Sequence, residues 1–366
     1  MVSANRLPVI HPACCLWALL VLSALLPGAT NLSGQTVRGQ IVSDQGESPP
    51  VAGAFVSLLD ENGFRVAAAF TEPNGFFEVT AAGGGIFRLK VDRIGFQEWL
   101  SPPMTLGGGE EQTVRFSVTV VPVRLADIDV NVHHQCVTDP ENAVEISTVW
   151  QEAQKALETT AWAEGEGSYR FDTNTYERRM DKDLDVENVR SRAHSGVART
   201  PFHSLPARDL AERGYLRQQD DSYHYFAPDA EVLLSRSFEQ DHCFGLVRLE
   251  LEGRNYLGVS FEPARGNRLP DITGILWLDE QTAEIQNLEF NYVNLPWRLE
   301  DRNVGGMVSF RRLPNDAFVV RQWFIRMPEL EIRNDRFGRV DVLGYKEDGG
   351  ELIGVFTPRG DRVSWN

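Results

Sequence analysis

The chain has 366 residues, of which 42% are apolar and 24% charged, a composition typical of globular proteins. It excludes collagen-like, coiled-coil and largely disordered chains, and the length suggests about two domains. The 52 acidic and 36 basic residues give a formal charge of −16. A surface of that sign repels phosphate backbones, so we expect no nucleic-acid partner.

Residues 1–34 are typical of a secretory signal peptide. Arg6 is the only charged residue before Gln35, and an apolar run of 13 residues, 14–26, is followed by small residues. The run is shorter than the roughly 20 residues needed to cross a bilayer. We therefore expect cleavage between Ala29 and Gln35 and export to the periplasm or outer membrane. No later apolar run is long enough to predict a transmembrane span in the mature chain.

Residues 35–122 predict a seven-stranded antiparallel β-sandwich. Apolar and polar residues alternate along 87–91 and 114–120, which is the period of half-buried strands. Turn sequences rich in Gly, Asn and Pro separate such runs: 60–63, 72–75, 82–85 and 106–109. Strands at this spacing without a helical period favour a sandwich.

The same region resembles the carboxypeptidase regulatory-like domain, a transthyretin-like sandwich. The resemblance rests on these segments: Val37–Val42, Val51–Val56, Thr71–Phe77, and Phe87–Val91 leading to Gly95-Phe96. It implies a non-catalytic module of the kind found beside metallocarboxypeptidases, in surface proteins and ahead of the plug of TonB-dependent receptors. A scaffold role is the first interpretation, and carbohydrate binding is the alternative.

Residues 136–366, after a linker at 123–135, predict a larger antiparallel β-meander domain with one main helix. The helix begins at Asp139-Pro140 and extends to about Thr159, and a short second helix is expected at 205–213. The expected strands are 166–179, 183–193, 245–252, 255–262, 272–279, 284–293, 304–312, 317–327, 339–345 and 351–356. Short hairpin turns between long strands indicate the meander, with the helices covering one face.

Two of these strands, Asp271–Asp279 and the segment Ile285–Leu295, resemble part of the curved half-barrel of periplasmic lipoprotein carriers. The resemblance implies an apolar cavity for an acyl chain. The aromatic residues that would line it are Trp277, Phe290, Tyr292 and Trp323. The alternative is that these rings fill an ordinary core.

Removal of the signal peptide leaves two cysteines, Cys136 and Cys243. In an exported protein we expect them to form a disulfide, which closes a loop of 107 residues. Alternatives are free thiols, or a zinc site that also uses His133, His134 and His242. We favour the disulfide and predict no metal site.

Sequence motifs of catalysis are absent from the chain. No histidine begins a His-x-x-Glu or His-Glu-x-x-His motif, and neither Gly-x-Ser-x-Gly nor a phosphate-binding loop occurs. We therefore expect a non-enzymatic envelope protein without a cofactor, which engages an envelope protein, a glycan or a lipid. A carrier of a lipophilic ligand is the alternative, and a hydrolase comes third.

Overall fold

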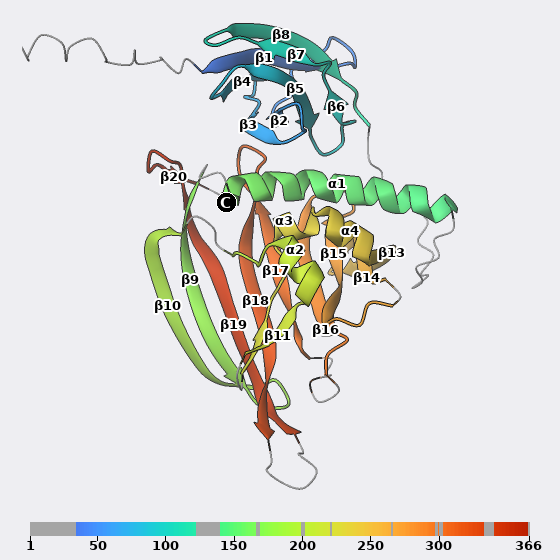
Figure 1. Cartoon of the computed structure of the whole chain (residues 1–366), viewed down its shortest axis with the longest axis vertical. Helices are drawn as coiled ribbons and strands as arrows, with labels where there is room; N and C mark the ends of the chain where they lie inside the picture. Colours follow the sequence, from blue (N-terminus) through green and yellow to red (C-terminus); the bar gives the residue numbers. More distant parts are fainter. Residues whose placement is uncertain are drawn as a thin grey trace, which may run out of the picture.

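The computed structural model describes residues 34–121, 140–165, 169–198, 202–219, 222–264, 266–296, 299, 303–332 and 340–364. The protein is mainly β, with a sandwich at its N-terminal end and a large antiparallel sheet below it (Figure 1). The expected signal peptide and the expected linker lie outside the described residues, so both stay predictions. None of the described helices combines the length and the apolar character that a membrane span requires.

The sandwich is built from short strands whose side chains alternate between core and solvent. Its strands are β1 (Gln35–Ser43), β2 (Phe55–Leu59), β3 (Arg65–Phe70), β4 (Phe76–Ala81), β5 (Gly85–Asp92), β6 (Trp99–Leu100), β7 (Met104–Leu106) and β8 (Glu111–Val118). They form a sheet in the order β4-β1-β8 and a second sheet in the order β3-β2-β5-β6, with β7 also beside β5. Along β4, Phe77, Val79 and Ala81 are buried and the residues between them are exposed, as the period of two predicts.

The sandwich differs from the expectation in strand count and in one pairing. It has eight described strands rather than seven, and β1 runs parallel to β8, with Thr36 opposite Glu111 and Ser43 opposite Val118. A parallel pair needs a long crossover connection, and the six intervening strands supply it. Alternation of side chains gives no information on the direction in which two strands pair, so the sequence could not reveal this.

The large sheet contains ten strands, and all its pairs of neighbours are antiparallel. They are β9 (Arg170–Met180), β10 (Val186–Ala198), β13 (His242–Leu251), β14 (Arg254–Pro263), β15 (Asp271–Asp279), β16 (Ile285–Val293), β17 (Gly305–Arg312), β18 (Phe318–Ile332), β19 (Val340–Phe356) and β20 (Arg362–Val363). Their order is β10-β9-β19-β18-β17-β16-β15-β14-β13, with β20 beside β19. The meander from β13 to β19 is therefore as expected, and β9 joins it by pairing with the long strand β19.

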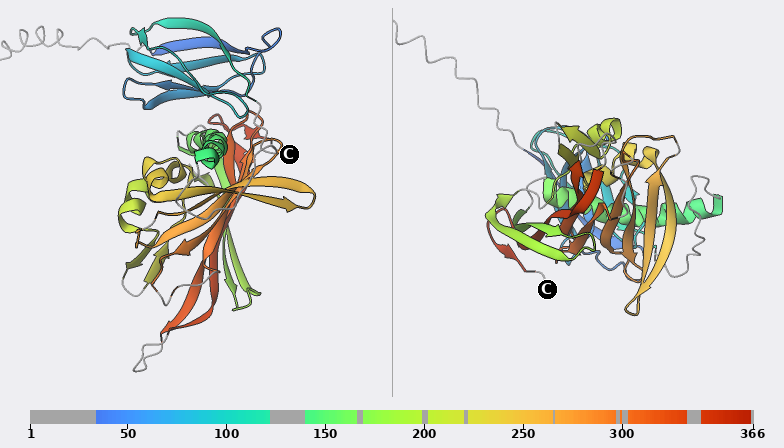
Figure 2. Two further views of the ribbon diagram at one scale, coloured as in Figure 1. Left: turned by 90° about the vertical axis from the view of Figure 1, so that its right-hand side faces the viewer. Right: turned by 90° about the horizontal axis from the view of Figure 1, so that it is seen from below.

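Helices cover one face of this sheet, and among the described residues no helix packs on the other (Figure 2). The covering elements are α1 (Pro140–Gly165), α2 (Ala207–Arg213), α3 (Ala230–Leu233), α4 (Arg236–Asp241) and the hairpin of β11 (Leu216–Gln219) and β12 (Ser222–Tyr225). Asp229 caps α3 by accepting the Val232 N–H, and Ser235 caps α4 by accepting the Phe238 N–H. We call the two sides of the sheet the helix-covered face and the open face.

Alternate residues of each strand go to the two faces. Leu257, Leu276 and Leu288 are buried in the core beneath the helices. Their strand neighbours Ser260 and Glu289 belong to the open face, together with the Ile275 that pairs with both. Each strand therefore contributes side chains both to the core and to the solvent-facing surface.

Helix α1 lies between the large sheet and the sandwich, and polar contacts join it to the sandwich (Figures 1 and 2). The Lys90 Nζ is 2.8 Å from a Glu158 carboxylate oxygen, and the Gly95 N–H donates to Glu152 over 3.0 Å. Lys155 donates to the Phe96 carbonyl over 2.6 Å. These contacts bind one side of α1 to the sandwich, while its apolar side packs on the sheet.

Two expected strands, 339–345 and 351–356, form the single strand β19. Gly349 and Gly350 lie in the gap between these two expected strands, and adjacent glycines are typical of turns. In the fold their missing side chains make room for neighbouring rings: a Cβ on Gly349 would be 2.4 Å from the Tyr176 Cζ, and one on Gly350 would be 2.8 Å from the Trp323 Nε1. Both positions require glycine because aromatic rings approach the backbone closely there, and not because the chain turns.

The remaining helical differences are smaller. Helix α1 continues to Gly165, beyond the expected end near Thr159, and α2 occupies 207–213 as expected. The short elements α3, α4, β11, β12 and β20 were not expected. Elements of two to six residues give too little periodicity to be read from sequence.

Candidate functional site

A continuous row of cross-strand partners crosses the open face. From β13 to β9 it consists of Gly245, Ser260, Ile275, Glu289, Met307, Phe324, Gly349 and Tyr176, each opposite the next. Since residues opposite one another in neighbouring strands point to the same side, these positions share one face. We call this set the open-face row.

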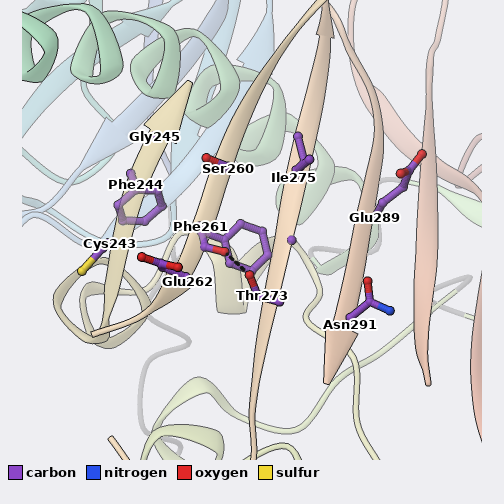
Figure 3. Close-up of a pocket in the computed structure, with 11 residues that line it drawn as sticks. Cys243, Phe244, Gly245, Ser260, Phe261, Glu262, Thr273, Ile275, Glu289 and Asn291 are labelled. Carbon is purple, nitrogen blue, oxygen red and sulfur yellow. Dashed lines mark hydrogen bonds between the residues drawn. The ribbon is translucent and has the colours of Figure 1, made fainter. Parts of the chain in front are cut away.

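A hollow of about 230 Å³ lies at the β13–β16 end of the open-face row (Figure 3). Its lining residues are Cys243, Phe244, Gly245, Ser260, Phe261, Glu262, Thr273, Gly274, Ile275, Glu289 and Asn291. The hollow has a simple cause: Gly245 has no side chain and Ser260 has a short one, so the surface drops beside the larger Ile275. Figure 3 views it from the side away from the helices, which lie behind the strands.

The rim of the hollow is polar and reaches solvent. Glu289 and Asn291 are exposed, and Glu262 and Thr273 are partly exposed. The Asn287 Nδ2 donates to a Glu289 carboxylate oxygen over 2.9 Å, and the Thr273 hydroxyl donates to the Phe261 carbonyl over 2.9 Å. A carboxylate has about four lone-pair sites and a hydroxyl has two, so one bond each leaves acceptor capacity for a ligand.

The charge on the open face changes along its length. Within the described residues, Glu262 and Glu289 take part in no ion pair, so the hollow is acidic. Toward β9, by contrast, Glu347 is only 1% exposed and lies 3.1 Å from Arg178 and 3.0 Å from Arg326. Two guanidinium groups thus surround this carboxylate, and the exposed Glu351 lies on the same face, two residues beyond Gly349.

The Glu347 group also fixes an aromatic ring on the open face. The Tyr176 hydroxyl donates to a Glu347 carboxylate oxygen over 3.2 Å, and its ring lies across Gly349. Burial, assisted by the charge of Glu347, raises the pKa of Tyr176 to about 12, so the phenol stays protonated. The neighbouring Phe324 ring lies 5.3 Å from the Arg326 guanidinium carbon.

The four aromatics expected to line an acyl-chain cavity do not share one face. Phe290 and Tyr292 are buried on the helix-covered face, where the Tyr292 hydroxyl donates to the Phe226 carbonyl over 2.9 Å. Trp323 packs on the same side against Phe202, with ring centroids 5.1 Å apart. Trp277 lies on the open face, since a Cβ on its partner Gly258 would be 2.8 Å from its ring. A ligand role for these residues stays a prediction.

Cys243 lines the hollow on the open face. Its expected partner Cys136, with His133 and His134, lies outside the described residues, so the disulfide stays a prediction. His242 is buried on the other face, with Nδ1 3.0 Å from the Phe238 carbonyl oxygen and Nε2 3.3 Å from the Asp271 carboxylate. Across the described part of the chain, no three His, Cys, Asp or Glu residues gather as metal ligands would.

No sequence motif marks the residues of the hollow. Ser260, Glu262, Thr273, Ile275 and Glu289 all lie on expected strands, and the polar half of the alternation at 288–292 was visible. Their gathering depends on the register between four strands. Register is a property of the folded sheet that no single strand reveals.

Comparison with protein families gives one match. Residues 36–119 match the carboxypeptidase regulatory-like domain. The match confirms the resemblance inferred from the β1 to β5 segments, and it covers the sandwich alone. Comparison with curated proteins gives no match.

Solved structures with partial similarity come from several kinds of protein. A DUF1329 family protein from Desulfovibrio piger is 10% identical, with a TM-score of 0.30, over 60% of this chain and 94% of that one. A putative carbohydrate binding protein from Bacteroides uniformis is 9% identical, with a TM-score of 0.20, over 63% and 91%. A cohesin–X-dockerin complex from Acetivibrio cellulolyticus is 18% identical, with a TM-score of 0.20, over 24% and 58%. The match spans less than two thirds of that chain, and TM-scores this low carry no functional argument.

Proposed function

We propose that the protein is an exported, non-enzymatic binding protein of the bacterial cell envelope whose open sheet face holds the ligand. The observation that carries the proposal is the hollow beside Ile275. It combines a cavity, an apolar centre and a rim of polar groups with hydrogen-bonding capacity, which are the features of a binding site. The helix-covered face of the same strands is filled by side chains.

Two features of the hollow support binding rather than catalysis. Cys243, bridged as predicted, would present no thiolate to a substrate. The adjacent His242 points to the opposite face, where it contacts the Phe238 carbonyl, so it offers the hollow no general base. Glu262 and Glu289 offer acceptors for a ligand without a partner that would make either a nucleophile.

The sandwich acts as a support for the binding domain. Its contacts with α1 use Lys90, Gly95 and Phe96, at the end of β5 and in the following turn. Lys90 is also 3.1 Å from Asp92, and the cluster is largely buried. A docked module of this kind holds the large sheet at a fixed orientation relative to the N-terminal end of the chain.

A retention assay tests the proposal. The purified full mature chain is incubated with three materials: insoluble cell-wall glycan, phospholipid vesicles, and periplasmic proteins immobilised on beads. We expect retention by one of them, and a roughly tenfold loss with Ile275→Arg, which fills the hollow. Val66→Arg is the matched control, because Val66 is an exposed apolar residue of the sandwich. Equal retention of both variants, or retention by none of the materials, would refute the proposal.

Export has its own test. Intact-mass measurement of natively produced protein should show loss of about 28–34 residues from the N-terminus. A mature protein that retains Arg6 would refute the envelope location.

A further inference from the structure

We infer that the hollow binds one ring of a neutral, hydroxyl-rich oligosaccharide, whose following sugars lie along the open-face row toward Tyr176. The inference rests on the proposed function and names the ligand class of the same site. It is carried by three observations: the size of the hollow, the chemistry of its lining, and the residues with which the row continues.

The size of the hollow fits a single ring. Sites that enclose a drug-sized molecule measure roughly 300–1,000 Å³, whereas this hollow measures about 230 Å³. It is also open to solvent at the Glu289 and Asn291 side. A small open hollow accepts one unit of a chain and lets the rest of the chain leave along the surface.

The lining matches the two kinds of surface that a sugar ring presents. Glu262 and Glu289 supply acceptors for hydroxyl donors, while Asn291, Ser260 and Thr273 can exchange hydrogen bonds with hydroxyl groups. Ile275 forms an apolar centre between them, against which the C–H face of a ring can pack. A phospholipid tail would offer no hydrogen bond to the Glu262 and Glu289 carboxylates, and an acceptor buried without a partner costs about 1–3 kcal/mol.

The open-face row supplies further contacts beyond the hollow. After Glu289 come Met307, Phe324 and, across Gly349, Tyr176. Neighbouring strands are about 4.8 Å apart, so these side chains recur at a spacing similar to the length of one sugar unit. Thioether and aromatic side chains are good stacking partners for sugar rings.

Charge selects a neutral ligand over a charged one. The hollow end carries Glu262 and Glu289, and the far end carries Arg178 and Arg326 around Glu347. A polyanion would be repelled at the first end, and a polycation would meet the Arg178 and Arg326 guanidinium groups at the second. A neutral chain meets no such penalty at either end.

Calorimetric titration of the full chain tests the inference with neutral oligosaccharides of one to six units. We expect affinity to rise roughly tenfold or more from one unit to four, and to change little between low and high salt. Phe324→Ala should remove most of the rise in affinity between one unit and four, because it deletes a ring that the longer chains would contact. Phe64→Ala, at an exposed ring of the sandwich, is the matched control and should behave as the unmodified protein does. Circular dichroism confirms that each variant is folded.

The outcomes separate the ligand class from the binding function. Failure of every neutral oligosaccharide, with Ile275-dependent retention of vesicles or periplasmic proteins, overturns the glycan and leaves the binding function standing. Titration of oligolysine instead, with affinity lost at high salt, shows a cationic ligand and also overturns it. An affinity independent of chain length refutes the extended site, and no Ile275-dependent binding to any material refutes the proposed function itself.

Discussion

The two faces of the large sheet are built from the same strands and differ in almost every property. On the helix-covered face, Leu257, Leu276 and Phe290 pack into one core under α1 to α4. On the open face, Ser260, Ile275 and Glu289 lie in one row with space above them. The side chains that stabilise the fold therefore lie on one face, and substitutions on the other face cost little stability. This separation lets one sheet hold its fold and bind a ligand without compromise between the two.

The largest expected effect is on the helix-covered face. Phe290 is 2% exposed, and its ring fills the space left by Gly306, where a Cβ would be 2.6 Å from it. Phe290→Ala should lower the free energy of unfolding by about 3–5 kcal/mol, because it removes apolar contacts and leaves a cavity. Urea unfolding followed by circular dichroism measures the change. A loss below about 1 kcal/mol would contradict the assignment of Phe290 to the core.

The predicted Cys136–Cys243 disulfide would connect the segment before α1 to the open-face side of β13. Removing it with Cys243→Ser should cost about 2–4 kcal/mol, because a bridge over a long loop restricts the unfolded chain. Thiol titration of the unreduced, denatured protein checks its presence directly. Two free thiols per mature chain, or a stoichiometric zinc ion released by a chelator, would show that the cysteines have another role.

A buried carboxyl of helix α1 makes the stability of the fold depend on pH. Burial raises the pKa of Glu164 to about 8 from its usual 4.5, against a hydrogen bond from the Val320 N–H that lowers it. The folded state thus keeps this proton to a higher pH than the unfolded state. Its contribution to stability is complete below about pH 4.5 and is lost as the pH rises through 8.

Glu164→Gln should remove that loss. The amide oxygen can still accept the Val320 N–H, and the variant carries no charge, so at pH 9 it should be more stable than the unmodified protein by roughly 1–3 kcal/mol. Thermal unfolding at pH 5 and pH 9 measures the difference. Glu289→Gln, the same substitution at an exposed carboxylate of the open face, is the control. Parallel profiles for Glu164→Gln and the unmodified protein would refute the buried, protonated carboxyl.

The smallest expected effect on stability is at the open face itself. Glu289 is exposed and belongs to no ion pair of the described residues, so Glu289→Ala should change the free energy of unfolding by less than about 0.5 kcal/mol. The same variant should weaken ligand retention in the assay with cell-wall glycan. A loss of stability comparable to that of Phe290→Ala would mean that the open face also stabilises the fold, so that the two faces do not have separate roles.

The sequence was sufficient for what depends on local pattern. Alternation at 87–91 and 114–120 predicted strands β5 and β8, and the sandwich segments indicated the family of the N-terminal domain. It was insufficient for what depends on bulges. Between Ser309 and Phe310 the register shifts by one residue. Val320 and Trp323 therefore lie on the same face, although their positions differ by three and a regular strand would place them on opposite faces. Such shifts determine which aromatic side chains contact one another, and the spacing of apolar residues in the sequence does not reveal them.

The position of helix α1 determines how the protein should respond to proteolysis between its two domains. Since Lys90, Gly95 and Phe96 hold it from the sandwich side and the core holds it from the sheet side, the covalent connection between Val121 and Pro140 is not the sole tie between the two parts. A protease that cleaves there would produce two bands on a denaturing gel and a single species in native chromatography. The contacts of α1 would hold the two fragments together after the covalent connection is lost.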